Sequence, residues 1–326
     1  MSGSRASGKG RPRRTGDARA DQVRVTGART DQVRTRGAGT SHARAHSAQG
    51  PPLLSSRRHP LVQEIRKLAQ RPQLGERSGL FLVDGIHLLE EALASPYRPE
   101  AILCGPRLQR IPNGRALLQK MRARDWPLRE VTEDLLSYLS TTQTAQGAVG
   151  LFRRPPSAPL PQPEEEGLAA LVLAGLQDPL NLGSLARTAR VFGCPRLIAL
   201  AETVDPLHPR ALRASSGWLL RMEIHRRVSV GDLGEWIAAH GVRAVALVPH
   251  GGARIDGIAP AAKPLAIVLG SEGAGLSTEV AALCTERWTI PMIEGADSLG
   301  VAAAGAIALF AAHQSGSRAG ASQDSR

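Results

Sequence analysis

The sequence has few aromatic residues, few cysteines and no apolar run long enough to cross a membrane. Phe, Trp and Tyr make up only 3% of the 326 residues, which disfavours a base-stacking platform like that of an RRM or an OB fold. Cys104, Cys194 and Cys284 stand singly, without histidines at ligand spacing, so we expect neither disulfides nor a metal site. The longest apolar stretch, 299–312, is too short to span a bilayer. These absences predict a cytoplasmic protein without a membrane partner.

The positive charge of the chain is concentrated at its N-terminus. Residues 1–50 hold 11 Lys and Arg against 3 Asp, a net charge of +8, whereas residues 51–326 contribute only +4. The segment is rich in Gly, Ser, Thr and Ala and lacks apolar periodicity, so it cannot bury enough surface to fold. We predict a disordered basic arm over residues 1–57, which is either a solubilising leader or a phosphate-binding arm.

Two folded regions follow the arm, with a linker between them. Residues 58–152 combine helical spacing, as in "HPLVQEIRKLAQ", with strand-like runs such as "GLFLVDG" and "EAILCG", and predict a small α/β domain. The proline-rich segment 153–167 has the composition of a semi-extended linker. Residues 168–314 contain apolar runs without alternation, such as "LAALVLAGL" and "PLAIVLG", which are typical of parallel strands with helices on both faces. We predict a doubly wound α/β domain there and a disordered tail at 315–326.

Three loops of the second domain are candidates for the functional site, because ligands of open α/β sheets lie at the carboxyl ends of the strands. They are "QDPLNLGSLARTARVFG" (177–193), "LGSEGAGLSTEV" (269–280) and "IPMIEGADSLGVAAAG" (290–305). Glycines in the second loop let the backbone approach a ligand closely. Their order is neither Gly-x-Gly-x-x-Gly nor a P-loop, which disfavours a dinucleotide or ATP site. Glycines that only make turns are the alternative for this loop taken alone.

In this order and at this spacing, the three loops resemble the signature motifs of the SpoU/TrmH family of RNA ribose 2′-O-methyltransferases, which belongs to the SPOUT superfamily. Residues 58–152 are similar to the L30e-like substrate-binding domain that precedes the catalytic domain in many members. The resemblance implies an α/β catalytic domain whose C-terminal part forms a trefoil knot, a rare exception to the rule against knots. It also implies S-adenosylmethionine as cofactor, a homodimer, and RNA as partner, with ribosomal RNA preferred to transfer RNA.

The resemblance also implies which residues form the site. The cofactor pocket would be formed by Leu269, Gly270, Glu272, Gly273, Ile290, Met292, Ser298 and Leu299. The catalytic centre would contain Asn181 and Arg187 of the first loop together with Glu272 and Ser298, with Arg187 at the mouth of the pocket. We expect the Arg187 guanidinium to stabilise negative charge on the ribose oxygen rather than to act as a base, since a guanidinium hardly deprotonates in proteins.

One residue departs from the family pattern. The third motif of the family usually reads Ser-Leu-Asn-Val, whereas this chain has Gly300 in place of the asparagine. Loss of a well-placed polar contact can cost about 10²-fold in rate. Two hypotheses follow. The first is an active methyltransferase, favoured by Asn181, Gly183, Arg187 and Glu272. The second is a catalytically weak or inactive RNA-binding protein of the same fold, favoured by Gly300.

Overall fold

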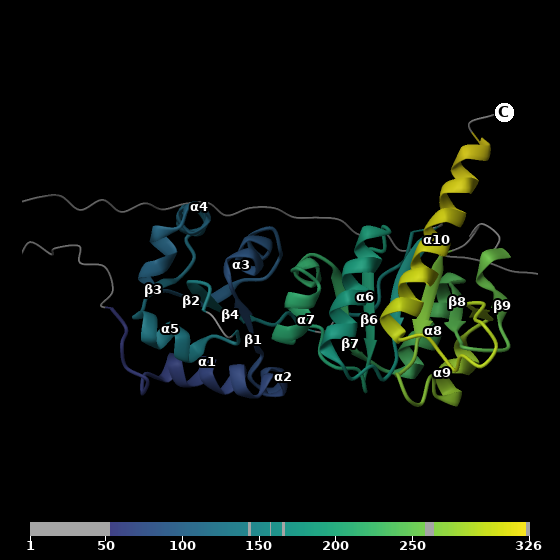
Figure 1. Ribbon diagram of the computed structural model, residues 1–326, viewed down its shortest axis with the longest axis horizontal. Coiled ribbons are helices and arrows are strands. Elements are labelled where there is room, and N and C mark those ends of the chain that lie inside the picture. The colour runs from purple at the N-terminus through teal and green to yellow at the C-terminus, as the bar shows by residue number, and fades with distance from the viewer. Residues whose placement is uncertain (1–52, 143–144, 157, 165–166, 258–263, 324–326) are drawn as a thin grey trace, which may run out of the picture. The chain divides into compact units, whose positions relative to one another are not determined.

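The structure is a computed structural model that describes residues 53–142, 145–156, 158–164, 167–257 and 264–323, with side chains up to residue 314. Two α/β domains follow one another along the chain (Figure 1). The predicted arm lies outside the described residues up to position 52. The first domain begins earlier than the predicted boundary at 58, because Leu54 pairs with a strand edge: its N–H donates to Glu130 O, and its carbonyl accepts from Thr132 N.

Within the described residues, the first domain is built on a four-stranded mixed sheet in the order β1-β4-β2-β3. Strand β4 is antiparallel to both β1 and β2, and β2 is parallel to β3. The strands are β1 (Leu80–Asp84), β2 (Pro99–Cys104), β3 (Leu128–Glu130) and β4 (Ala148–Arg153). The helices are α1 (Pro60–Gln70), α2 (Gly75–Ser78), α3 (Ile86–Leu93), α4 (Pro112–Ala123) and α5 (Glu133–Leu139), with 3-10 turns at Pro72–Leu74 and Pro106–Arg110.

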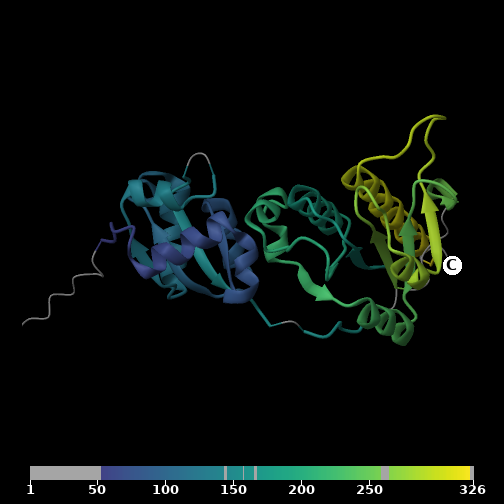
Figure 2. The same ribbon diagram turned by 90° about the horizontal axis from the view of Figure 1, so that it is seen from below.

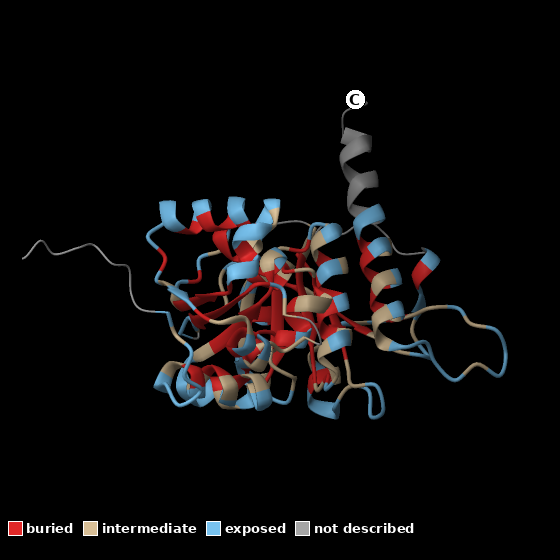
Figure 3. Ribbon diagram, turned by 60° about the vertical axis from the view of Figure 1, so that its left-hand side comes forward, coloured by how far each residue is buried: buried red, intermediate tan, exposed pale blue. Residues whose placement is uncertain are grey.

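Helices cover both faces of this small sheet (Figures 1 and 2). Alternate strand residues, such as Leu82 and Leu103, pack with the apolar sides of α1 and α5. Their neighbours in sequence, such as Phe81 and Ile102, pack with α3 and α4 on the other face. Successive side chains of a strand point to opposite faces, so each strand serves two cores. Burial follows the same pattern: the buried residues lie on the strands and on the inner sides of the helices (Figure 3).

The second domain contains, among the described residues, a seven-stranded sheet in the order β7-β6-β5-β10-β8-β11-β9, in which every pairing is parallel. This confirms the predicted doubly wound class. The strands are β5 (Leu168–Leu173), β6 (Arg196–Leu200), β7 (Glu223–Val228), β8 (Arg243–Leu247), β9 (Ala253–Arg254), β10 (Leu265–Leu269) and β11 (Glu286–Thr289). The helices are α6 (Pro179–Val191), α7 (Pro209–Ala214), α8 (Val230–His240), α9 (Thr278–Leu283) and α10 (Val301–Gln323), with 3-10 turns at Trp218–Leu220 and Ile255–Gly257.

Each face of the large sheet has its own helices. Leu171 and Ile267 point to the face covered by α6 and α10, whereas Val172 and Val268 point to the face covered by α8 and α9. Helices therefore shield both faces of the sheet from water, which explains the continuous apolar runs of β5 and β10.

The last helix extends beyond its predicted end. Residues 315–326 were expected to form a disordered tail, but the backbone of α10 remains helical to Gln323. Extending an existing helix fixes one residue for each new hydrogen bond, so it is far less costly than starting one. The small polar residues after position 314 therefore continue a helix that the packed segment before them has nucleated.

Helix α6 begins and ends at recognisable signals. Asp178 is its N-cap, with the side chain accepting from Leu180 N at 2.9 Å, and Pro179 occupies the first helical position. Gly193, with φ +84°, follows the helix in the left-handed conformation that favours glycine after a helix end. These signals fix the two ends of the helix, which occupies most of the first candidate loop at 177–193.

Gly183 lets α6 and α7 pack closely. A Cβ at this position would lie 2.5 Å from Ala211 O and 2.6 Å from Ala214 Cβ. We expect Gly183→Ala to lower the free energy of unfolding by about 2 kcal/mol through overpacking, as measured by urea denaturation. Ser184→Ala, at an exposed position on the same helix, is the control and should stay within about 0.5 kcal/mol of wild type. Equal stability of Gly183→Ala and wild type would contradict the close packing.

Candidate active site

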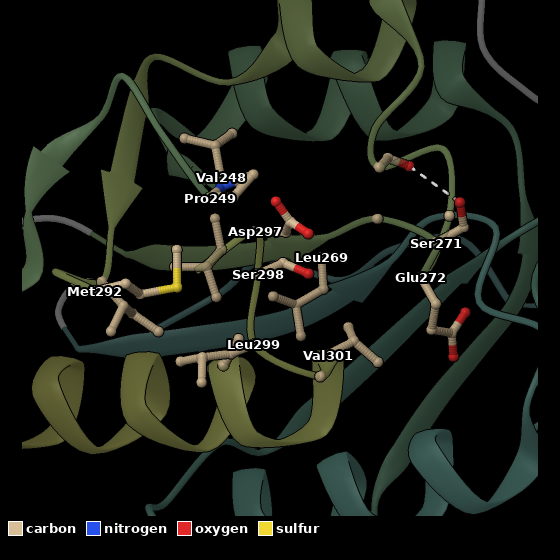
Figure 4. Close-up of a pocket in the computed structure, with 17 residues that line it drawn as sticks. Val248, Pro249, Leu269, Ser271, Glu272, Met292, Asp297, Ser298, Leu299 and Val301 are labelled. Carbon is tan, nitrogen blue, oxygen red and sulfur yellow. Dashed lines mark hydrogen bonds between the residues drawn. The ribbon is translucent and has the colours of Figure 1, made fainter. Parts of the chain in front are cut away.

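A pocket of about 390 Å³ lies at the carboxyl ends of β8, β10 and β11 (Figure 4). These three strands are neighbours in the sheet. The lining residues come from three segments, within 247–249 after β8, 269–275 after β10, and 290–304 from the end of β11 into α10. The position matches the general rule for ligands of open parallel sheets. The volume falls in the range of small-molecule sites.

All eight residues predicted for the cofactor pocket line this one cavity. Leu269, Glu272, Met292, Ser298 and Leu299 surround it from different segments in Figure 4. The fold thus brings the second and third candidate loops together, although they are separated by a helix and a strand.

Sequence reasoning missed one wall of the pocket. Leu247, Val248 and Pro249 line it from the end of β8. The sequence does indicate the strand itself, because "RAVALV" is an apolar run that ends at a proline. Its place beside β10 depends on strand order, which local sequence does not reveal.

The loop after β10 is a tight turn that needs glycine. Ser271 and Gly275 exchange two backbone hydrogen bonds of 3.0 and 3.1 Å, and Gly275 has φ +68°. A Cβ at Gly270 would lie 2.2 Å from the carbonyl carbon of Gly275. The turn therefore closes only because position 270 lacks a side chain.

A hydrogen bond joins the first loop to the second. Asn181 Nδ2 donates to Glu272 Oε1 at 2.9 Å, across 91 positions of sequence. Asn181 lies in the first turn of α6, and Glu272 lines the pocket. The asparagine thus holds the glutamate carboxylate at the edge of the cavity.

The family resemblance placed Arg187 at the mouth of the pocket. In the structure, Arg187 does not face the pocket of its own chain. It is exposed, it is not among the lining residues, and it forms no ion pair or hydrogen bond with the described residues. The helical period explains this, since Arg187 shares a stripe of α6 with Leu180 and Val191, which are also exposed. The opposite side of the helix is buried against the sheet.

The electrostatics of the pocket favour a cationic ligand. Its 17 lining residues include two carboxylates, Glu272 and Asp297, and no lysine, arginine or histidine. Apolar side chains, among them Leu269, Ile290 and Met292, supply much of the remaining wall. A pocket without basic side chains is poorly suited to phosphate groups, which usually recruit Arg or Lys.

Among the described residues outside the pocket, His208 has a structural role and the three cysteines are free thiols. His208 caps α7 by accepting from Arg210 N at 3.1 Å, and burial lowers its pKa. Burial raises the pKa of Cys104 to about 12 and those of Cys194 and Cys284 to about 11, so these free thiols stay protonated near neutral pH. In the part of the chain that the structure describes, no group of three potential ligands forms a metal site. No helix there is long and apolar enough to cross a membrane.

The fold and the pocket define a class of protein: an α/β domain with a small-molecule pocket at the ends of its central strands, preceded by a separate α/β domain. Comparison with known protein families narrows this class to one family. The SpoU rRNA methylase family matches residues 169–310, and the MRM3-like substrate binding domain matches residues 59–150. The chain belongs to the SpoU rRNA methylase family.

Similar proteins match nearly the whole of the two domains. An uncharacterized tRNA/rRNA methyltransferase of Synechocystis is 31% identical over 261 residues, covering 80% of this chain and 93% of the relative. The 23S rRNA (guanosine(2553)-2′-O)-methyltransferase RlmP of Bacillus subtilis is 28% identical, with coverages of 79% and 97%. The crystal structure of an AdoMet-bound rRNA methyltransferase from Sinorhizobium meliloti superposes with a TM-score of 0.72 at 29% identity, covering 81% of this chain and 97% of that one.

Proposed function

We propose that this protein transfers the methyl group of S-adenosylmethionine to a ribose 2′-hydroxyl of ribosomal RNA. The observation that carries the proposal is one cavity, lined by all eight predicted cofactor residues and lacking basic side chains. The Bacillus relative is named as a 2′-O-methyltransferase of 23S rRNA, and the Sinorhizobium relative was crystallised with AdoMet. The protein is an RNA ribose methyltransferase of the SpoU family.

The residues of the pocket fit S-adenosylmethionine. This cofactor supplies a methyl group on a positively charged sulfur and carries an adenine ring, ribose hydroxyls and an amino-acid end. Leu269, Ile290 and Leu299 would contact the adenine ring. The carboxylates of Glu272 and Asp297 would attract the positive charges on the sulfur and the amino group of the cofactor. Backbone N–H and C=O groups of the loop at 270–275 would orient it.

The catalytic step needs alignment and stabilisation of charge more than covalent chemistry. Arg187 does not face the pocket of its own chain, so we assign it to the ribose oxygen at the pocket of a second subunit, where its guanidinium would stabilise the negative charge that grows as the hydroxyl loses its proton. Asn181 would position Glu272 through their hydrogen bond, and Ser298 would contribute a hydroxyl at the pocket wall. The proton would leave to a phosphate oxygen or to water.

A homodimer is proposed from an exposed apolar surface on α6 and α10, which pack against each other. Leu180 and Val191 on α6, and Ile307 and Phe310 on α10, are large apolar side chains in solvent. Arg187 lies on the same stripe of α6, so a second subunit would provide surroundings that fix its guanidinium. The molecular mass in solution tests this: twice the chain mass supports the dimer, and the mass of a single chain contradicts it.

A cytoplasmic location is part of the same proposal and fits the three free cysteines. The C-terminal trefoil knot implied by the family also stays a prediction.

The proposed reaction is tested with the full-length protein, labelled S-adenosylmethionine, and purified ribosomal RNA or transfer RNA. We expect label in ribosomal RNA, recovered after digestion as a 2′-O-methylated nucleoside. Label on a base, or only in transfer RNA, would contradict the proposed substrate. RNA binding without any labelling would favour the alternative of a catalytically inactive RNA-binding protein.

Gly300 allows a direct test of the departure from the family motif. A Cβ at this position meets no atom within 4 Å, and the residue lines the pocket, so a side chain can leave the backbone here without a clash at its Cβ. We expect Gly300→Asn to raise kcat by about tenfold, because it restores an amide that can hold the reacting groups. Gly300→Leu controls for the added volume and should not raise kcat. If Gly300→Asn is no faster than wild type, the missing amide does not limit the reaction.

A further inference from the structure

The positive charge of the two folded domains lies in the first of them. Residues 53–154 contain 16 Lys and Arg against 10 Asp and Glu, whereas residues 168–314 contain 12 of each. The domain that holds the cofactor pocket therefore has no net charge. A polyanionic partner is attracted to the first domain rather than to the second.

Two arginines of this domain lie over the ring of one tyrosine. The guanidinium carbons of Arg57, just before α1, and of Arg66, within α1, each lie 4.5 Å from the centroid of the Tyr138 ring on α5. Arg66 also donates to the carbonyl of Tyr138 at 2.7 Å. Helices α1 and α5 cover the same face of the small sheet, so the three side chains form one cluster there. We call Arg57 and Arg66 the Tyr138 arginine pair.

No carboxylate among the described residues neutralises the pair. Neither arginine forms an ion pair with a carboxylate among the described residues, and the Arg57 guanidinium has no hydrogen-bond acceptor among them. Other arginines do have such partners, for example Arg243 with Glu286 and Arg254 with Asp256. Holding two like charges against one ring costs electrostatic free energy, which a bound anion would recover.

The two side chains differ in how they can bind phosphate. Arg57 is exposed and has no hydrogen-bond acceptor among the described residues, so its N–H groups are available for a pair of phosphate oxygens. Arg66 already donates to the Tyr138 carbonyl and lies beside the Gln70 amide, so it contributes mainly its positive charge. The ring also limits the rotamers of both arginines, which reduces the entropy lost on binding. Two prearranged guanidiniums on one surface match the repeated phosphates of a nucleic acid backbone.

We infer that the Tyr138 arginine pair binds phosphates of the ribosomal RNA backbone and anchors the RNA to the α1/α5 face of the first domain. The inference rests on the proposed function in taking ribosomal RNA as the partner. The contact is to the backbone, so it contributes affinity and orientation rather than recognition of a base sequence.

The test compares two double variants of the full-length protein that remove the same charge. Arg57→Gln/Arg66→Gln removes the pair. Arg115→Gln/Lys120→Gln removes two exposed charges from α4, on the opposite face of the sheet. Binding of purified 23S ribosomal RNA is measured by filter retention over a series of salt concentrations. We expect the pair variant to bind about tenfold more weakly and to reduce the slope of log affinity against log salt by about 1.4 to 1.8.

The control variant should keep the wild-type slope. A reduction of the slope as large in the α4 variant as in the pair variant, or none in either, would overturn the inference. The single variant Arg57→Gln breaks no side-chain hydrogen bond within the described residues, so it should fold as the wild type does. We expect its salt dependence of binding to fall by about half as much as that of the double variant. Because binding is measured without methyl transfer, a protein that binds through the pair but never methylates RNA would contradict the proposed function alone.

Discussion

Replacing Arg187 with lysine is expected to lower kcat for methyl transfer by about a hundredfold. Lysine keeps the positive charge but loses the planar fork that fixes two hydrogen bonds at once. A donor aimed at developing charge is worth about 10²- to 10³-fold in kcat when removed. Because Arg187 lies outside the pocket lining, the affinity for S-adenosylmethionine should stay within about twofold of wild type. Initial rates at saturating RNA, together with calorimetric cofactor binding, measure both quantities.

A matched variant separates this effect from any general effect of arginine-to-lysine exchange. Arg287 is an exposed arginine on β11 that does not line the pocket, so Arg287→Lys should retain the wild-type rate. Near-normal turnover in Arg187→Lys would refute a role that depends on guanidinium geometry. A parallel loss of cofactor binding would show that Arg187 acts on the pocket and not on the ribose.

Gly270→Ala is expected to weaken binding of S-adenosylmethionine by about a hundredfold. The new methyl group would lie 2.2 Å from the carbonyl carbon of Gly275 and 2.6 Å from Leu276 N, so backbone rather than a flexible side chain would have to move. Opening the turn between Ser271 and Gly275 displaces a wall of the pocket. Overpacking costs about 1–3 kcal/mol, and about 2.7 kcal/mol corresponds to a hundredfold change in Kd.

The control for this substitution is Gly231→Ala in α8, where the nearest atom to a new Cβ is Ser229 Oγ at 3.7 Å. That change should leave cofactor binding intact and slightly stabilise the helix. Circular dichroism of both variants establishes that the sheet is retained. If a folded Gly270→Ala protein binds the cofactor as wild type does, the loop after β10 does not form the binding wall.

Much of the second domain could be predicted because both faces of its sheet are buried. Strands β5, β6, β8 and β10 are continuous apolar runs, and their sequences alone indicated a parallel sheet. Strand β7 was missed because "EIHRRV" is largely polar. It lies at the edge of the sheet, where one side has no neighbouring strand and fewer apolar residues are needed.

The candidate site was predictable to the extent that its residues are close in sequence. Each glycine-containing loop could be recognised alone, and the family resemblance linked them. The contribution of Val248 and the hydrogen bond between Asn181 and Glu272 depend on how distant segments meet in space. The helical period places Arg187 on the same exposed side of α6 as Leu180 and Val191. The predicted orientation toward the pocket rested on the family motif instead, and therefore differed from the structure.

The central claim is that the cavity between the loops after β8, β10 and β11 holds S-adenosylmethionine. Isothermal titration of the full-length protein with S-adenosylmethionine, and separately with S-adenosylhomocysteine, tests it most directly. We predict saturable heat for both compounds in the wild type and about hundredfold weaker binding in Gly270→Ala. Absence of heat for both in folded wild-type protein would contradict the account.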